Sequence, residues 1–370
     1  MSRTVVVGAG LLGASVAHRL AEAGVAVTVV EADRPAGGTS GASFAWVNAQ
    51  DKAPAAYAAL NEAGVRAYPA LATELGGDWL HPGGDLAFGV GTGANAVAER
   101  LTRHEERGYA VRRLDRAGVL SLEPDLVLPG DGGEFVAGHF PDEAWVDVPG
   151  MVGRLLRAAR SGGAELVVGD RVDEPLIESG RVRGVRLASG RTIAAERVVL
   201  AAGPATEVLA RHVGIELPMA PTPGLLALSG PVAARVGRVI HGAGVALRPD
   251  GGGRVMISSR TVDGALDPGV ARMTVDAEPV RELLARAARL LPELREAGIE
   301  TARIGRRSVP SDGLPAAGFA PEVDGLYVLV SHSGVTLAPV LGRLVAAELA
   351  GRPASELEPY RPARFVGAAA

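Results

Sequence analysis

The sequence Thr4-Val-Val-Val-Gly-Ala-Gly-Leu-Leu-Gly13, close to the start of the chain, decides the fold. The β-branched run at residues 3–7 predicts a buried parallel strand, and the apolar spacing of residues 11–23 predicts a helix. Gly24 ends that helix, and residues 26–30 predict a second buried strand. The order of strand, glycine-rich turn, helix and strand therefore predicts a parallel βαβ unit.

Each glycine of the turn has its own physical role. Gly8 permits a tight turn, Gly10 lets a ligand approach the backbone, and Gly13 lets the helix pack close to the strand. The helix N-terminus, with the N–H groups of Leu11 and Leu12, offers hydrogen-bond donors and the positive end of a dipole. This turn is therefore suited to a diphosphate.

The second predicted strand ends on a carboxylate. Glu31 lies about 20 residues past the glycines, where an acidic side chain suits the hydroxyls of an adenosine ribose and repels a 2′-phosphate. Strand, helix and acid together predict a dinucleotide site, with a glycine-rich turn that binds no nucleotide as the alternative. This stretch alone leaves open whether the dinucleotide is FAD or NAD.

Composition limits the class of protein. The chain has 370 residues, 47% of them hydrophobic, a net charge of −4, no cysteine, and Lys52 as its only lysine. This slightly negative net charge does not indicate a basic surface that would bind nucleic acid or an anionic membrane. No apolar run is long enough to span a membrane. Because the first strand starts at residue 3, we expect no signal peptide and a cytoplasmic location. The lack of cysteine excludes disulfides and thiolate ligands, and we predict no metal site.

The end of the chain repeats the arrangement of its start. Residues 325–330 predict a strand, residues 331–334 a small polar loop, and residues 336–349 a helix. Residues 225–273, between the two ends, are mostly strand-like. Such an order favours a discontinuous FAD domain over a simple NAD dehydrogenase. We predict an α/β fold with a discontinuous Rossmann-like FAD-binding domain (residues 1–80, 145–220 and 303–370) and a β-rich, antiparallel-sheet substrate domain (residues 81–144 and 221–302).

Five motifs follow one another along the chain: Gly8-Ala-Gly-Leu-Leu-Gly13 with Glu31, Gly38-Thr-Ser-Gly-Ala-Ser43, Val198-Val-Leu-Ala-Ala-Gly203, Gly305-Arg-Arg-Ser-Val-Pro-Ser-Asp-Gly-Leu-Pro315, and Ser331-His-Ser-Gly-Val-Thr-Leu-Ala-Pro339. In residues and order they resemble the FAD-dependent D-amino acid oxidase superfamily. The branch of glycine oxidases, sarcosine oxidases and D-amino acid dehydrogenases is the most similar. The resemblance covers nearly the whole chain.

The resemblance implies a bound FAD. We expect it to be held non-covalently, because the sequence has no cysteine and no histidine near residues 39–43. A helix N-terminus at the pyrimidine side of the flavin would stabilise the negative charge of reduction, with an ordinary helix N-cap as the alternative for residues 332–336. The implied cofactor-binding residues are Gly8, Gly10, Leu11, Leu12, Gly13, Glu31, Thr39, Ser40, Ala42, Ser43, Val172, Ala202, Gly203, Gly334, Val335, Thr336 and Leu337.

Two residues are implied as catalytic. Arg307 matches the family position that pairs with the substrate carboxylate, and its planar fork would fix the substrate with the Cα–H facing flavin N5. An ion pair within the protein is the alternative for Arg307, and Arg306 is expected to point away. His332 is the second candidate, with a role in proton balance.

The substrate pocket is less well defined. Trp46 and Asn48 follow the flavin loop closely enough to reach the substrate, although Trp46 as a buried aromatic plug is an equal alternative. His241 is the pocket candidate from the β-rich region, against an ordinary strand-end histidine. Lys52 is expected to be solvated rather than to approach the flavin.

The resemblance implies oxidation of the C–N bond of a D-amino acid, glycine or sarcosine-like secondary amine, by hydride transfer to flavin N5 with an imine as product. The alternative is a flavin subunit of a heteromeric amine, opine or hydroxyproline dehydrogenase. A tRNA-modifying flavoprotein is disfavoured by the acidic balance. The expected partners are an amine substrate and O2 or another electron acceptor, without nucleic acid or an integral membrane segment. Homo-oligomers and heteromers both stay open.

Overall fold

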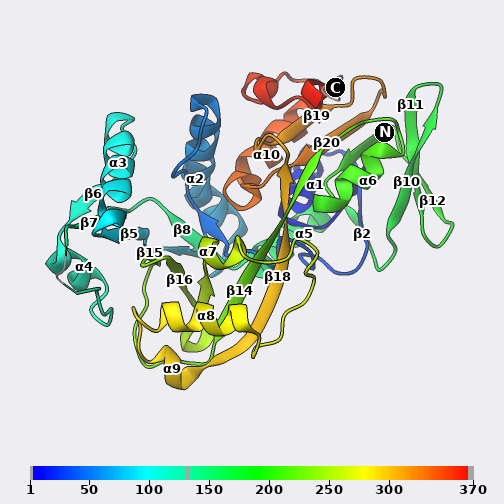
Figure 1. Ribbon diagram of the computed structural model, residues 1–370. Helices are drawn as coiled ribbons and strands as arrows, with labels where there is room; N and C mark the ends of the chain where they lie inside the picture. Colours follow the sequence, from blue (N-terminus) through cyan, green and yellow to red (C-terminus); the bar gives the residue numbers. More distant parts are fainter. Residues whose placement is uncertain (1–2, 131–132, 366–370) are drawn as a thin grey trace.

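Six strands from the start, middle and end of the chain form one sheet in the computed structural model, which describes residues 3–130 and 133–365 (Figure 1). Its order is β19-β20-β13-β1-β2-β9, and every neighbouring pair is parallel except β19 with β20. The expectation that the C-terminal strand joins the N-terminal sheet is confirmed. The strands are β1 (Arg3–Val7), β2 (Ala26–Glu31), β9 (Glu165–Val168), β13 (Arg197–Leu200), β19 (Ala316–Phe319) and β20 (Leu326–Val330).

Both faces of this sheet are buried, which is why its strands read as continuous apolar runs. Side chains alternate between the faces: Val6 and Val199 pack in the core under four helices, whereas Val5 and Val198 pack in a second core on the opposite face. The four helices are α1 (Leu11–Glu22), α2 (Ala55–Leu75), α5 (Val148–Ser161) and α10 (Gly334–Leu349).

A small antiparallel sheet and a short helix cover the opposite face (right in Figure 1). These elements are β10 (Val172–Glu178), β11 (Arg181–Leu187), β12 (Thr192–Ala194) and α6 (Thr206–Arg211). Two 3-10 turns, Ser355–Tyr360 and Pro362–Phe365, follow α10 near the C-terminal end of the described chain.

The lower and left parts of Figure 1 hold an eight-stranded sheet of order β18-β14-β17-β16-β15-β5-β7-β6. All its neighbouring pairs are antiparallel except β15 with β5. Its strands are β5 (Asp85–Val90), β6 (Arg112–Leu114), β7 (Phe135–Phe140), β14 (Met219–Ser229), β15 (Val239–Gly242), β16 (Val245–Asp250), β17 (Arg254–Ser258) and β18 (Ile299–Pro310). The helices beside it are α3 (Thr92–Glu106), α4 (Arg116–Leu122), α7 (Arg260–Asp263), α8 (Glu278–Ala287) and α9 (Leu294–Ala297).

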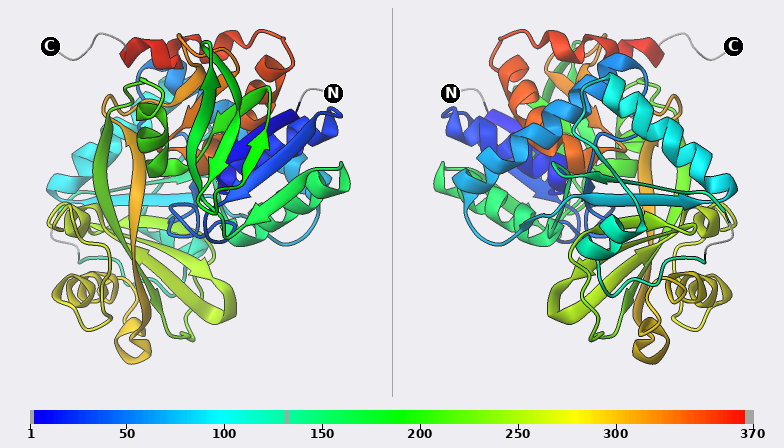
Figure 2. Two further views of the ribbon diagram at one scale, coloured as in Figure 1. Left: turned by 90° about the vertical axis from the view of Figure 1, so that its right-hand side faces the viewer. Right: turned by 90° about the vertical axis from the view of Figure 1, so that its left-hand side faces the viewer.

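The long pair β14 and β18 forms one edge of the eight-stranded sheet and extends toward the six-stranded sheet, as the left view of Figure 2 shows. Two boundaries of the predicted domain division, 220/221 and 302/303, fall inside these strands. The chain therefore passes from one predicted domain to the other within the paired strands β14 and β18. The division itself stays a prediction. A second small sheet consists of β3 (Trp46–Val47), β8 (Ala144–Val146) and β4 (Leu80–Pro82).

The predicted fold class is confirmed. One detail of the prediction is wrong: the strand pattern of residues 225–273 ends at Ser258, where the Ser259 side chain caps α7 by accepting from the Val262 N–H. Within the residues that the structure describes, no helix is both long enough and apolar enough to cross a bilayer.

The packing of α1 on the first strand gives a test. A Cβ at Gly13 would lie 2.0 Å from the Gly8 carbonyl oxygen. We therefore expect Gly13→Ala to lower the free energy of unfolding by ~1–3 kcal/mol, as overpacking does, in a urea titration. The control is Gly153→Ala on α5, where no described atom lies within 4 Å and alanine is favoured by ~0.5–1 kcal/mol. Equal losses in both variants would contradict the close-packing role of Gly13.

Candidate active site

A cavity of about 790 Å³ opens at the carboxyl ends of β1, β2, β13 and β20. Open α/β sheets bind ligands at this edge, and the volume lies within the usual range of about 300–1,000 Å³. His332 is part of its wall. Of the predicted cofactor-binding residues, those at the wall are Gly8, Gly10, Leu11, Leu12, Glu31, Thr39, Ser40, Ser43, Val172, Ala202, Gly203, Gly334 and Val335.

The glycine-rich turn is shaped by close backbone contacts. Gly8 has a φ of 102°, and a Cβ there would lie 2.6 Å from the Ala201 carbonyl oxygen on the neighbouring segment. A Cβ at Gly10 would lie 2.9 Å from Ser40 Oγ, which accepts the Leu11 N–H at 3.1 Å. The turn and the 37–43 loop therefore come together at the N-terminus of α1, where an anion is favoured.

The Glu31 carboxylate is fixed at the cavity wall. Oε2 accepts the Ala9 N–H at 2.8 Å, and Oε1 accepts the Asp33 N–H at 3.0 Å. These bonds join the end of β2 to the turn after β1. The carboxylate is thus held in one orientation beside the turn.

Four predicted cofactor-binding residues lie behind the wall and not at it. Gly13 packs on the Gly8 carbonyl, and Ala42 faces Gly305 of β18. Thr336 Oγ1 accepts the Asn48 N–H at 3.1 Å, and Leu337 is fully buried in the helical core. These residues support the wall.

Arg307 lies across the neighbouring strand. A Cβ at Gly224 would be 2.7 Å from its Nη2, so the guanidinium fills the space that this glycine leaves. Nη1 donates to the Pro223 carbonyl at 3.0 Å, and Nη2 donates to Asp263 Oδ2. The internal ion pair that the sequence left as an alternative is therefore present. It uses two of the five guanidinium N–H groups. Arg306 is exposed, as expected.

The charges of three cationic side chains act on His332. Burial, followed by the charges of Lys52, Arg307 and Arg260, lowers the pKa of His332 to about 4, so its ring is neutral at pH 7. Lys52 is half-buried, and burial together with the charge of Arg260 lowers its own pKa. The expectation that Lys52 is solvated is wrong, because its side chain is only partly exposed and burial is the main cause of its lowered pKa.

The predicted pocket residues Trp46 and His241 lie side by side, with ring centroids 4.2 Å apart. His241 Nδ1 lies 2.6 Å from Asp85 Oδ1, and Trp46 Nε1 donates to Glu143 Oε2 at 2.9 Å. Gln50 Nε2 bridges the two acids at 2.8 and 3.0 Å. Neither ring lines the large cavity. Trp46 therefore joins a buried polar network and is not an apolar plug.

Glu143 is the most strongly perturbed member of this network. Burial and the charge of Asp85 hold the pKa of Glu143 well above its usual range. The Tyr109 hydroxyl contacts its Oε1 at 2.9 Å. Asn48, also predicted for the pocket, is buried, and its side chain donates to the Trp46 carbonyl.

The family model for FAD-dependent oxidoreductases of the DAO type matches residues 3–348. The chain belongs to this family. It is 30% identical to a glycine oxidase of Geobacillus kaustophilus, over 98% of this chain and 97% of that protein. It is 26% identical to one of the subunits of an opine oxidase from Rhizobium meliloti, over 97% and 96% of the two chains. The crystal structure of the Geobacillus glycine oxidase superposes with a TM-score of 0.87, at 26% identity, and covers 99% of this chain and 100% of that one.

The cavity fits the FAD that this family uses. Its wall combines a helix N-terminus for the diphosphate with a fixed carboxylate for the ribose, the two features that an adenine dinucleotide requires. The chain is thus an FAD-dependent oxidoreductase acting on amines or amino acids.

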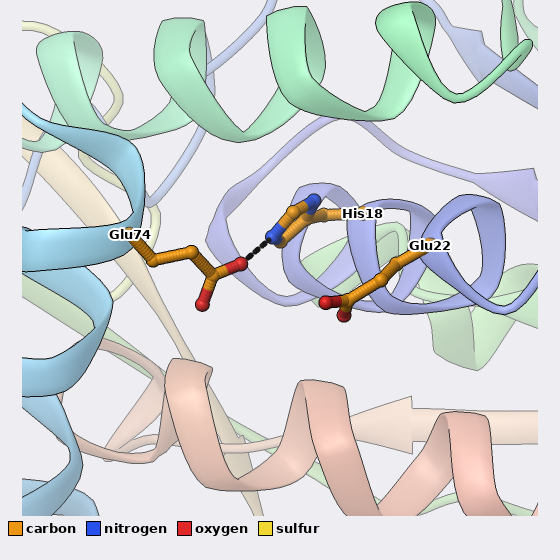
Figure 3. Close-up of side chains that lie close together, drawn as sticks. All are labelled: His18, Glu22 and Glu74. Atoms are coloured by element: carbon orange, nitrogen blue, oxygen red, sulfur yellow. Dashed lines mark hydrogen bonds and ion pairs between the residues drawn. The ribbon is translucent and has the colours of Figure 1, made fainter.

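A group of possible metal ligands lies elsewhere, between α1 and α2 (Figure 3). His18, Glu22 and Glu74 each offer a ligand atom within 4.8 Å of the others. Arg19 already donates to Glu22 at 2.8 Å and to both oxygens of Glu74 at 2.9 and 2.7 Å. The group is therefore an ion-pair network that joins the two helices.

Sequence reasoning missed the acidic partners of the site. Asp263 is the last residue of α7 and Asp85 the first residue of β5, and neither lies in a recognisable sequence motif. Glu143 lies in the turn before β8. Arg260 had no signal either. Lys52 did have one, because a single lysine in a chain with many arginines is unusual.

The pKa of Glu143 gives a test of the buried network. Above about pH 4.5 an unfolded chain releases this proton while the folded chain keeps it, so this group lowers stability as the pH rises toward the folded pKa. We expect Glu143→Gln to remove this loss and to raise the melting temperature relative to wild type at pH 7–8 but not at pH 4. Exposed Glu99→Gln is the control. A variant less stable than wild type at pH 8 would show that Glu143 is ionised there.

Proposed function

We propose that this chain oxidises the C–N bond of a small amine that carries a carboxylate, such as a D-amino acid, glycine or a sarcosine-like secondary amine, to an imine. One observation carries the proposal: the Pro223 carbonyl and Asp263 hold the Arg307 guanidinium with N–H groups to spare, and its charge acts on His332, which lines the cofactor cavity. The similarity to glycine oxidases supports it.

In this proposal, FAD is bound non-covalently along the cavity. Glu31 holds the adenosine ribose, and Val172 lies at the adenine. The turn at Gly8, Gly10, Leu11 and Leu12 holds the diphosphate. The remaining predicted cofactor-binding residues lie along the diphosphate and the flavin, with Gly13, Ala42, Thr336 and Leu337 as support. The start of α10 directs N–H groups toward negative charge that develops on reduction.

The residues of the chain orient the substrate. Asp263 and the Pro223 carbonyl fix the Arg307 fork, so its remaining N–H groups receive the carboxylate in one orientation. Bound FAD supplies the acceptor for the hydride that leaves the substrate α-carbon. Neutral His332 can donate or accept a hydrogen bond there without adding charge. The route needs no dedicated base, and the imine hydrolyses in water to a carbonyl compound and an amine or ammonia.

In this proposal Trp46, Asn48 and His241 affect substrate binding indirectly, through the segment that they support. The tilted Trp46 and His241 rings, bonded to Glu143 and Asp85, form a rigid support for the segment that ends at Lys52. We propose that this support shapes the substrate side of the cavity.

The alternative is a flavin subunit of a heteromeric dehydrogenase, favoured by the similarity to the opine oxidase subunit. The two functions differ in the electron acceptor. After anaerobic reduction by glycine or sarcosine, rapid reoxidation on admission of air supports an oxidase, and reoxidation only by an artificial dye supports a dehydrogenase. The cytoplasmic location stays a prediction.

Arg307 can be tested directly. We expect Arg307→Met to lower the second-order rate constant for anaerobic flavin reduction by glycine or sarcosine about 100-fold, because two charge-assisted hydrogen bonds are lost. Exposed Arg303→Met on the same strand is the matched control. Unchanged reduction in Arg307→Met, or bleaching by amines without a carboxylate, would remove Arg307 from this role.

The pH dependence tests His332. With a pKa of about 4, its ring does not titrate between pH 6 and 9. We expect His332→Asn to change the rate of flavin reduction but to leave the shape of its pH profile over this range unchanged. A wild-type inflection in this range that is lost in the variant would show that His332 exchanges a proton during turnover.

A further inference from the structure

The charges of three cations from three different elements act on His332, which lines the same cavity as Ser308, the neighbour of Arg307. Arg307 projects from β18 across β14. Arg260 lies one helical turn before Asp263 on α7, on the face that contacts Arg307. Lys52 follows the segment that is bonded to the first turn of α10. The charges of all three act on His332, and that of Arg260 also acts on Lys52.

Among the described residues, only one of these cations has a partner. Arg307 is paired with Asp263, whereas across residues 3–130 and 133–365 neither Lys52 nor Arg260 forms a hydrogen bond or ion pair through its side chain. The two nearest acids on the Lys52 side are engaged elsewhere. Asp51 pairs with Arg100 at 2.9 Å and Arg103 at 3.3 Å, and Glu143 accepts from the buried network.

This leaves more positive charge than one carboxylate can neutralise. The Arg307–Asp263 pair with its substrate carboxylate carries a net charge of −1. Lys52 and Arg260 together carry +2, and the half-buried Lys52 is costly to leave without an anion. With the amine neutral, as hydride transfer requires, a monocarboxylate such as glycine leaves one cation uncompensated, whereas a dicarboxylate brings the group to neutrality.

We propose that the substrate is an amine with two carboxylates, of which Arg307 holds the one beside the reacting carbon while Lys52 and Arg260 hold the other. The inference rests on the proposed function and narrows its substrate class. The second carboxylate lies either on the other nitrogen substituent or on the side chain of an amino acid. Both place an anion a few bonds from the oxidised C–N bond.

Sarcosine and iminodiacetate test the proposal because they differ only by one carboxylate. We expect anaerobic flavin reduction in the holoenzyme to have a second-order rate constant about tenfold or more higher with iminodiacetate. Lys52→Met and Arg260→Met should each lower it about 10- to 100-fold for iminodiacetate and less than about threefold for sarcosine. Aspartate and glutamate, tested as both enantiomers, show whether a side-chain carboxylate serves instead.

Binding without turnover gives an independent measurement. Thiodiacetate and (methylthio)acetate have the shapes of the two amines but no nitrogen to oxidise. We expect calorimetric titration to give tighter binding of thiodiacetate, by about tenfold, and loss of this preference in Lys52→Met and Arg260→Met. Exposed Arg272→Met, which also removes one positive charge, is the control for long-range attraction.

The outcomes separate the two levels of the proposal. If sarcosine or glycine reduces the flavin and no dicarboxylic amine does so better, the second carboxylate site is refuted and the proposed function stands. If Lys52→Met slows sarcosine and iminodiacetate equally, Lys52 acts on the flavin and not on a second carboxylate, which also refutes it. If no carboxylated amine reduces the flavin, the proposed function itself fails.

Discussion

The pairing of β14 with β18 is the constraint on which the site depends. Because successive side chains of a strand point to opposite sides, neighbouring residues of β18 serve different purposes. Ser308 reaches the cofactor cavity, and Arg307 reaches across β14 to Asp263. The same strand touches the 37–43 loop, where the Arg306 carbonyl accepts from Thr39 Oγ1 at 2.6 Å. One ladder therefore sets the distance between the cofactor cavity and the Arg307 guanidinium.

The acidic and the basic side chains near the β14–β18 pair form two separate groups. Asp85 and Glu143 are buried behind the pocket and satisfied by hydrogen bonds from Gln50 and their aromatic neighbours. The charges of the three cations act on His332, and two of them have no anion of their own among residues 3–130 and 133–365. The acids nearest to Lys52, Asp51 and Glu143, are already occupied. Because the cations are separated from the acids in this way, the electrostatic potential is positive on the proposed substrate side. The hydrogen-bonded acids behind it form a rigid layer whose polar groups are satisfied.

The parts of the molecule that the sequence predicted well depend on local chemistry. The βαβ unit with Gly8, Gly10 and Glu31, and the strand and helix around Ser331, are specified by residues close in the chain, and the cavity assembles them as expected. Arg307 was predicted as a site residue because it lies inside a motif. Lys52 stood out only as the single lysine, and Arg260 had no signal, because their electrostatic coupling links segments some 200 residues apart, which no local pattern encodes. The Arg307–Asp263 pair has the same origin.

The continuity of β14 and β18 also restricts how the enzyme can move. Domains that open and close around a ligand turn on a few residues that can change their φ and ψ freely. Here the two halves are joined by paired strands of 11 and 12 residues, and bending at their crossing would break ladder hydrogen bonds. Large hinge opening is therefore costly. Exchange of substrate with solvent would then depend on local rearrangements of side chains and loops at the cavity, and not on a domain rotation.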